Sequence, residues 1–297
     1  MRLAVTGKNG QVVSALQALA NDKLEIVTLG RPELDLAKPE TVAKALRDAK
    51  PDAVVSAAAY TAVDKAESEP DIAFAVNRDG ARAVAQAAKE IGIPVIHLST
   101  DYVFDGTKTA AYVESDPTGP ASVYGRSKLE GEQTVSEITA DYVILRTAWV
   151  YSEYGSNFVK TMLRLSESRD EVNVVADQFG CPTSAKDIAT AIVTIARKLA
   201  VDKSPLLRGV FHLSGTGETN WADFAKQVFA FSAENGGKPV IVNDITTVQY
   251  PTPAPRPANS RLDCSKLEDV YGIKLPNWQS STRAVVAALA QSKKETP

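Results

Sequence analysis

The sequence predicts an α/β protein whose first half forms a doubly wound parallel sheet and whose second half forms a smaller α/β lobe. Three observations predict this fold class. Short runs that are apolar throughout alternate with helical patterns, the first run leads into a glycine-containing turn, and the alternation loosens after about residue 150. Strands that are apolar on both faces are typical of parallel sheets that helices cover on both sides.

The alternation in the first half is regular. Short apolar runs predict five strands, at 3–6, 24–29, 52–57, 94–98 and 142–145. Segments with apolar residues three and four positions apart predict the helices between them, at 11–20, 39–49, 71–91 and 122–136. Strict alternation of strands and helices is the pattern of a Rossmann-type domain.

The second half follows a looser pattern. It predicts helices at 157–168, 184–199, 220–232, 265–271 and 280–291, and strands at 173–175 and 209–213. A proline-dense stretch occupies 250–257, and we expect the tail at 292–297 to be frayed. Because no flexible linker separates the halves, we expect residues 151–297 to pack directly on a domain at 1–150, with some segments returning to that domain.

Composition excludes several classes of function. The 297 residues carry 33 basic and 36 acidic side chains, a balance that argues against binding nucleic acid by neutralising phosphates. Two Cys and two His exclude a disulfide framework and a Cys/His zinc site. No apolar stretch approaches the roughly 18 residues of a membrane span, and the apolar start is too short for a signal peptide. We therefore expect a cytoplasmic protein without membrane partners.

A glycine turn follows the first strand. Gly7 and Gly10 let the backbone turn tightly, and such a turn before a helix can hold a pyrophosphate. An ordinary strand-to-helix turn is the alternative, and Val13 stands where a third glycine is usual. After the second strand, Arg31 stands where NAD-binding sites place an acidic residue, which favours a 2′-phosphate and hence NADP. A solvated loop arginine is the competing interpretation.

Tyr124 and Lys128 lie four residues apart at the start of a predicted helix, so they share one face. Tyrosine has an ordinary pKa of about 10, and a nearby ammonium favours the phenolate and lowers that pKa. Such a pair suits the reduction of a carbonyl, which needs a proton as well as a hydride. Thr100, at the end of the fourth strand, is expected to hydrogen-bond the substrate carbonyl in preference to Ser99.

The glycine turn, the Ala57–Ala59 run, the Ser99-Thr100 pair and the Tyr-x-x-x-Lys pair together resemble the extended short-chain dehydrogenase/reductase family. Longer strings are similar to its dTDP-4-dehydrorhamnose reductase branch, from the first strand to about residue 280. They are GKNGQV at 7–12, AAAYTAVDKAE at 57–67, STDYVFDG at 99–106, RTAWVY at 146–151, DQFGCPT at 177–183 and RPANSRL at 256–262.

The resemblance implies reduction, by NAD(P)H, of the 4-keto group of dTDP-6-deoxy-L-lyxo-4-hexulose. It implies that Tyr124 donates the proton, Lys128 anchors the nicotinamide ribose and Thr100 replaces the usual serine. The implied cofactor contacts, besides Gly7, are Gly10, Gln11, Val12, Asp35, Leu36, Ala59, Tyr60 and Thr61. The residues implied to border the sugar are Asp101, Val103, Phe104 and Trp149.

A nucleotide diphosphate needs a positive clamp. Arg256 is our first choice, because it lies among prolines that restrict the loop. The prolines there fall at every second residue, so the spacing excludes a Pro-x-x-Pro recognition motif. Further polar contacts to the substrate are expected from Asn157, Gln178, Thr183 and Asn259, each with an ordinary loop hydrogen bond as the alternative.

Several alternatives stay open. A related fold serves as a non-catalytic regulatory subunit of methionine adenosyltransferase, and an epimerase or a reductase of another nucleotide sugar also fits. The position after Asp101 is Tyr102 where sugar 4,6-dehydratases carry glutamate, which argues against elimination. NADPH is expected, with NADH as the alternative, and a homodimer is compatible with the resemblance. Some members dimerise around Mg²⁺ through a glutamate near position 15; because Ala15 stands here, we predict no metal.

Overall fold

The computed structural model describes residues 1–295 and contains a six-stranded parallel sheet with the order β10-β5-β4-β3-β1-β2. Its strands are β1 (Arg2–Thr6), β2 (Glu25–Leu29), β3 (Ala53–Ser56), β4 (Val95–Thr100), β5 (Tyr142–Thr147) and β10 (Gly209–His212). The direction of winding reverses between β1 and β3, and the carboxyl ends of strands beside such a switch point form a ligand crevice. The predicted fold class is confirmed.

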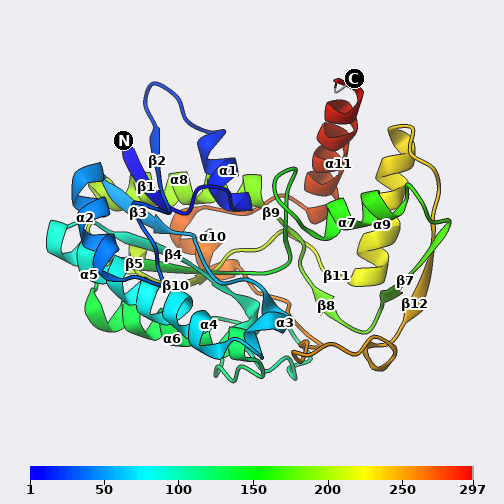
Figure 1. Cartoon of the computed structure of the whole chain (residues 1–297), viewed down its shortest axis with the longest axis horizontal. Helices are drawn as coiled ribbons and strands as arrows, with labels where there is room; N and C mark the ends of the chain where they lie inside the picture. The colour runs from blue at the N-terminus through cyan, green and yellow to red at the C-terminus, as the bar shows by residue number, and fades with distance from the viewer. Residues whose placement is uncertain (296–297) are drawn as a thin grey trace.

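Helices cover both faces of this sheet (Figure 1). On one face lie α1 (Gln11–Gln17), α8 (Ala185–Val201) and α10 (Ser265–Tyr271). On the other lie α2 (Glu40–Ala49), α5 (Gly80–Ile91) and α6 (Val123–Ile138). The central strands are buried from both sides, with Leu3, Val54 and Ile96 fully buried, which explains why their sequences are apolar throughout.

The helix predicted at 71–91 is one helical stretch with an irregular middle. It consists of α4 (Pro70–Phe74), a π-helical turn η1 (Ala75–Asp79) and α5. Asn77 in the π turn is buried, and its side chain bonds to the backbone of Tyr60 and to the hydroxyl of Ser127. Side-chain periodicity carries no signal for the extra residue of a π turn. A short helix, α3 (Val63–Ala66), precedes this stretch.

The smaller lobe is built from α7 (Phe158–Leu165), α9 (Trp221–Glu234) and α11 (Trp278–Glu295) around the parallel pair β7 (Glu171–Val175) and β12 (Ile241–Ile245). Two short pairs accompany it: β6 (Val150–Tyr151) with β9 (Thr183–Ser184), and β8 (Phe179–Gly180) with β11 (Thr219–Asn220). We did not predict β12. The expected frayed tail is helical at 292–295, and residues 296–297 lie outside the described part.

The second half of the chain also completes the large sheet. Strand β10 pairs with β5, and α8 and α10 pack on the face opposite α5 and α6. Ile188, Ile192 and Ile195 of α8 are fully buried against that face. Within residues 1–295, no helix has the length and apolar character needed to cross a membrane.

Candidate active site

A cleft of about 450 Å³ opens at the carboxyl ends of β1, β3, β4 and β5. Residues from both halves of the chain line it, including Gly7, Gly10, Gln11, Val12, Ala59, Thr61, Ser99, Tyr124, Lys128, Thr147, Gly155 and Ser156. The predicted glycine turn and the predicted Tyr–Lys pair therefore lie in one cleft.

The glycine turn forms one wall of the cleft. Gly7 has φ of 102°, a conformation that favours glycine, and its N–H donates to the carbonyl of Leu29 at 2.6 Å. Gly10 is the residue before α1, with extended backbone. A Cβ on Gly7 or Gly10 would stand 3.4 or 3.5 Å from Cγ2 of Val13, so this valine fills the room that a third glycine would leave. The wall presents backbone rather than side chains to a ligand.

Two buried hydroxyls in the cleft have no protein partner among the described residues. They are Oγ of Ser99, at the end of β4, and Oγ1 of Thr147, at the end of β5. Buried polar atoms are almost always hydrogen-bonded, so a ligand or ordered water must satisfy this pair. Together with the glycine wall, they make the cleft fit a polar ligand such as a dinucleotide. Sequence reasoning ranked Ser99 behind Thr100 and passed over Thr147, although the strand-end rule points to Thr147 as it does to Thr100.

Lys128 is buried in this cleft, and its ammonium donates to the carbonyl of Leu98 at 2.6 Å. Burial lowers the pKa of Lys128 to about 8, although the charge of Glu132, one turn further along α6, acts to raise it. Glu132 itself forms a buried pair with Arg146 at 2.6 Å. Lys128 is thus held in place by the end of β4.

Tyr124 stands on the same face of α6. Burial raises the pKa of Tyr124 to about 12; a hydrogen bond with the Thr100 hydroxyl lowers it, and the charge of Asp101 raises it further. We expected Lys128 to lower this pKa, whereas burial of the phenol, the largest influence on it, raises it. A tyrosine with this pKa keeps its proton at neutral pH and can give it to a substrate.

Thr100 links Tyr124 to the strand end. Its hydroxyl donates to Oδ1 of Asp101 at 2.9 Å and accepts the N–H of Tyr102 at 3.2 Å, which caps the turn η2 (Asp101–Val103). Burial raises the pKa of Asp101 to about 6. The cap and the contact with Tyr124 are therefore made by the same side chain.

Three residues that were predicted to contact the cofactor lie outside the lining of the cleft. The side chain of Leu36 is buried against Gly80, where a Cβ would stand 2.7 Å from that of Leu36, so only its backbone can face a ligand. The hydroxyl of Tyr60 turns to Glu69 at 2.6 Å, away from the cleft lining. Arg31 is 82% exposed and 3.9 Å from Asp35, outside the cleft lining.

Four predicted substrate residues are buried in contacts with other protein groups. Val103 is fully buried, and Phe104 stacks on Tyr112 with 4.1 Å between ring centroids. The hydroxyl of Thr183 is fully buried between the carbonyl of Cys181 and the N–H of Gly215. Asn259 is also buried. Its amide donates to the carbonyls of residues 108 and 110, and its oxygen accepts from residue 261. These four side chains hold the loops together.

Three further substrate candidates lie at the border of the two lobes. Trp149 has φ of 50°, an uncommon conformation for a bulky residue, and stacks on Trp221 with 3.5 Å between ring centroids. Asn157 caps α7 and donates to Oε1 of Gln11 at 3.0 Å, so it faces the glycine wall of the cleft rather than a substrate. Gln178 donates to the hydroxyl of Thr247 at 3.0 Å.

Arg256 reaches across from the proline-dense stretch and pairs with Asp64 of α3 at 2.7 Å. It is four-fifths buried and is close enough for its charge to act on Tyr102, whose ring meets the Tyr124 ring edge-on at 5.5 Å. The candidate clamp therefore lies one side chain, Tyr102, away from the candidate proton donor.

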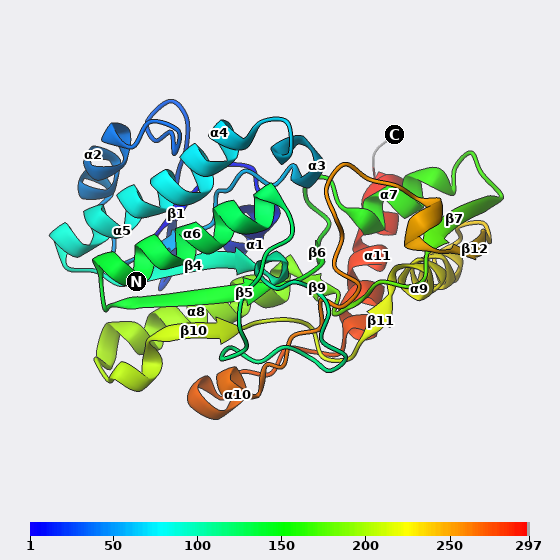
Figure 2. The same ribbon diagram turned by 90° about the horizontal axis from the view of Figure 1, so that it is seen from below.

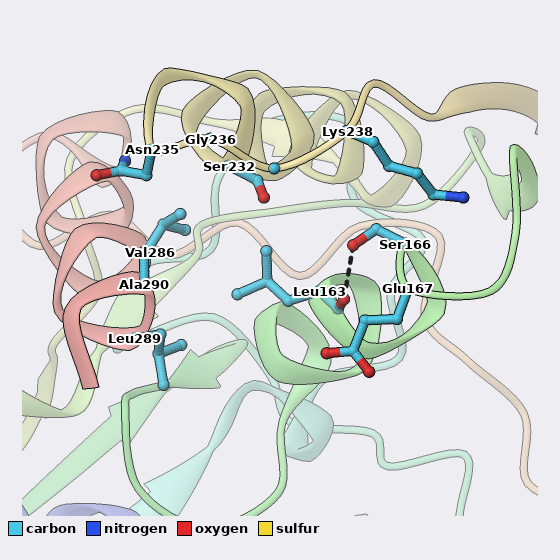
Figure 3. Close-up of a pocket in the computed structure, with 11 residues that line it drawn as sticks. Leu163, Ser166, Glu167, Ser232, Asn235, Gly236, Lys238, Val286, Leu289 and Ala290 are labelled. Carbon is cyan, nitrogen blue, oxygen red and sulfur yellow. Dashed lines mark hydrogen bonds between the residues drawn. The ribbon is translucent and has the colours of Figure 1, made fainter. Parts of the chain in front are cut away.

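Another cleft, of about 350 Å³, lies between α7, α9 and α11 (Figure 3). Its floor is apolar, with Leu163, Val286 and Leu289. Ser166 donates to the carbonyl of Leu163 at 2.6 Å, and Lys238 extends away to pair with Asp170 at 3.0 Å. No acid–base pair of the described residues converges there, so the sheet cleft is the candidate active site.

Comparison with known proteins identifies the protein family. The family described as RmlD substrate binding domain matches residues 1–291. The chain belongs to this family. A dTDP-4-dehydrorhamnose reductase of Sinorhizobium fredii is 63% identical over 289 residues, which cover 97% of this chain and 98% of that protein. The chain is thus an oxidoreductase of the dTDP-4-dehydrorhamnose reductase type.

Solved structures of the same family agree. A dTDP-4-dehydrorhamnose reductase of Clostridium acetobutylicum superimposes with a TM-score of 0.90 at 36% identity and covers 97% of this chain and 99% of that one. One of Bacillus anthracis, in complex with NADP, gives 0.89 at 35% identity and covers 96% and 98%. The expected family is therefore confirmed, and at least one relative of known structure binds NADP.

Proposed function

We propose that this chain reduces the 4-keto group of dTDP-4-dehydro-6-deoxy-L-mannose (dTDP-6-deoxy-L-lyxo-4-hexulose) to give dTDP-L-rhamnose. The observation that carries the proposal is the placement of Tyr124 and Lys128 in one cleft, with the Thr100 hydroxyl against Tyr124, in a family whose relatives are named for this reaction. NADPH is the proposed reductant because a relative binds NADP, and NADH is the alternative.

The chemistry follows from the site. The nicotinamide cofactor supplies the hydride to C4 of the sugar. Tyr124 gives its proton to the 4-keto oxygen, and the Thr100 hydroxyl turns from Asp101 to donate a hydrogen bond to the same atom. The C4 carbon thereby gains the hydride, its oxygen gains the proton as the C=O double bond becomes a single bond, and Tyr124 recovers its proton from solvent. Lys128 holds the ribose and, in its charged form, stabilises the phenolate left behind.

We assign the remaining residues by their positions. The backbone of the glycine wall, at Gly7, Gly10, Gln11 and Val12, holds the pyrophosphate, while Ala59, Thr61, Ser99 and Thr147 contact the nicotinamide half. Asp35 and the exposed Arg31 are assigned to the adenosine half. Asp101, Trp149 and Gln178 border the sugar nucleotide, and Arg256 meets its diphosphate. A homodimer and a cytoplasmic location stay predictions from the sequence.

The test is a turnover assay with purified protein, NADPH and the 4-keto sugar nucleotide. We expect oxidation of NADPH matched by the appearance of dTDP-L-rhamnose. Turnover only with another nucleotide sugar would favour the alternative substrates. Stoichiometric capture of methionine adenosyltransferase, with no NADPH oxidation on any nucleotide sugar, would support the regulatory-subunit hypothesis and overturn ours.

A further inference from the structure

The proline-dense stretch crosses from the smaller lobe to the sheet domain. We call residues 250–257 the strap; it carries prolines at 251, 253, 255 and 257. Figures 1 and 2 show the orange segment that contains it approaching α3. Its carboxyl end is packed tightly, because a Cβ on Gly106 would stand 2.5 Å from Cβ of Pro257. Its middle meets the sheet domain at Asp64.

Asp64 holds the strap with both carboxylate oxygens. Oδ2 accepts from Nη2 of Arg256 at 2.7 Å, and Oδ1 accepts the N–H of Ala254 at 3.2 Å. The carbonyl of Ala254 in turn accepts from Thr252 at 2.9 Å and from Nη1 of Arg256 at 3.3 Å. A single carboxylate from the sheet domain thus orients both the turn of the strap and its guanidinium.

This contact lies near the cofactor cleft, on the side where the substrate is proposed to bind. Asp64 follows Thr61 of the cofactor cleft by three residues, and Arg256 is near Tyr102, which touches Tyr124. A guanidinium has five N–H donors in a rigid fork. Asp64 and Ala254 engage two of them, which leaves three for phosphate oxygens.

We propose that Asp64 is a positioning residue, which holds Arg256 in the orientation that binds the diphosphate of the nucleotide sugar. The inference rests on the proposed function. An arginine that is already oriented loses less side-chain entropy on binding. The contact between the lobes also fixes the separation of the strap from the sheet domain. The opposite arrangement, in which Asp64 competes with the diphosphate for Arg256, predicts the opposite effect of removing its charge.

The experiment is steady-state kinetics of Asp64→Asn, which removes the charge but keeps an oxygen for the Ala254 N–H. We expect KM for the nucleotide sugar and the inhibition constant of dTDP to rise together, by about five- to tenfold. We expect kcat and the NADPH dissociation constant to stay at the wild-type values. Glu218→Gln is the matched control, because Glu218 pairs at 2.9 Å with Arg261, an arginine that follows the strap and lies outside it; this variant should change none of these constants.

A double-mutant cycle tests whether Asp64 acts through Arg256. In an Arg256→Gln background, Asp64→Asn should add no further rise in KM, whereas additive effects would overturn the inference. A fall in KM in the single variant would show competition and overturn it too, as would an equal loss of kcat and NADPH affinity. A wild type that reduces no 4-keto sugar overturns the proposed function, while an active wild type with an unaffected Asp64→Asn overturns the inference alone.

Discussion

Tyr124 and Lys128 have pKa values displaced by the same cause in opposite directions. Burial disfavours a phenolate and an ammonium alike, so it raises the first pKa to about 12 and lowers the second to about 8. At neutral pH the tyrosine therefore holds its proton, and the lysine is charged, with a pKa only slightly above the pH. This combination suits an acid that must donate a proton rather than a base that removes one.

Tyr124→Phe should remove the proton donor and leave the cleft intact. We expect kcat to fall by about 10²- to 10⁴-fold, because a positioned acid contributes that much to proton transfer. Binding of NADPH, measured by fluorescence titration, should change little. A variant that turns over at the wild-type rate would show that another group supplies the proton.

The affinity for NADPH should weaken as the pH rises through about 8. The pKa of Lys128 is lowered to about 8, so the ammonium is present below that pH and is lost above it. Without the charge, Lys128 offers fewer donors to the ribose hydroxyls. The measurement is the NADPH dissociation constant between about pH 7 and pH 9. The control is Lys128→Met, which should bind more weakly but without this pH dependence; an equal dependence in both proteins would assign the titration elsewhere.

At the level of elements, α6 is positioned by its contact with the π turn. The Asn77 amide donates to the hydroxyl of Ser127 at 2.9 Å, and Ser127 lies between the tyrosine and the lysine of the site. Gly131, one turn later, lets the helix approach the carbonyl of Asn77. The π turn thus fixes the position and rotation of α6, which carries Tyr124 and Lys128.

Gly131→Ala tests that close approach. Alanine in place of glycine ordinarily stabilises a helix interior, by about 1 kcal/mol. Here the added Cβ would collide with the Asn77 carbonyl, so we expect the free energy of unfolding to fall by about 1–3 kcal/mol. Ser136→Ala, at an exposed position of the same helix, is the control and should change stability by less than about 0.5 kcal/mol. Urea denaturation measures both, and a stabilised Gly131→Ala would contradict the close packing.

Over the whole molecule, the two lobes share structure instead of meeting at a single boundary. Strand β10, α8 and α10 come from the second half but complete the sheet domain. Gln11 accepts from Ser152 at 2.9 Å and from Asn157 at 3.0 Å at one side of the cleft, and Asp64 bonds Arg256 at the other. The cleft therefore has a contact between the halves on both of its sides.

A chain that ends at residue 150 should fail to fold on its own. It lacks β10, so β5 becomes an exposed edge, and it lacks α8, so the apolar face around Leu3, Val5 and Leu145 is open to water. We expect an insoluble product, or one without a cooperative thermal transition, where the full chain melts cooperatively. A soluble fragment with a cooperative transition would show that residues 1–150 form an independent domain.

Much of the fold and part of the candidate site could be predicted from the sequence. Every strand of the large sheet coincides with a predicted apolar run, and the central strands are largely apolar because helices bury them on both faces. The glycine turn, Tyr124 and Lys128 were also found, because backbone conformation and helical spacing are local properties. Strand β12 was missed, since Asn243 and Asp244 interrupt its apolar pattern.

The contacts of the loop side chains could not be predicted in the same way. Phe104, Thr183 and Asn259 stand in strings that suggest a substrate site, yet they pack inside the loops that form it. Ser99 ranked behind Thr100 on sequence alone, and Thr147 was not a candidate, until the sheet placed their two unpartnered hydroxyls at one edge. Asp64 meets Arg256 across 192 residues of sequence. Local pattern determines which elements form and which chemistry they carry, whereas contacts between distant segments depend on how those elements pack, and packing alone decides which loop side chains face a ligand.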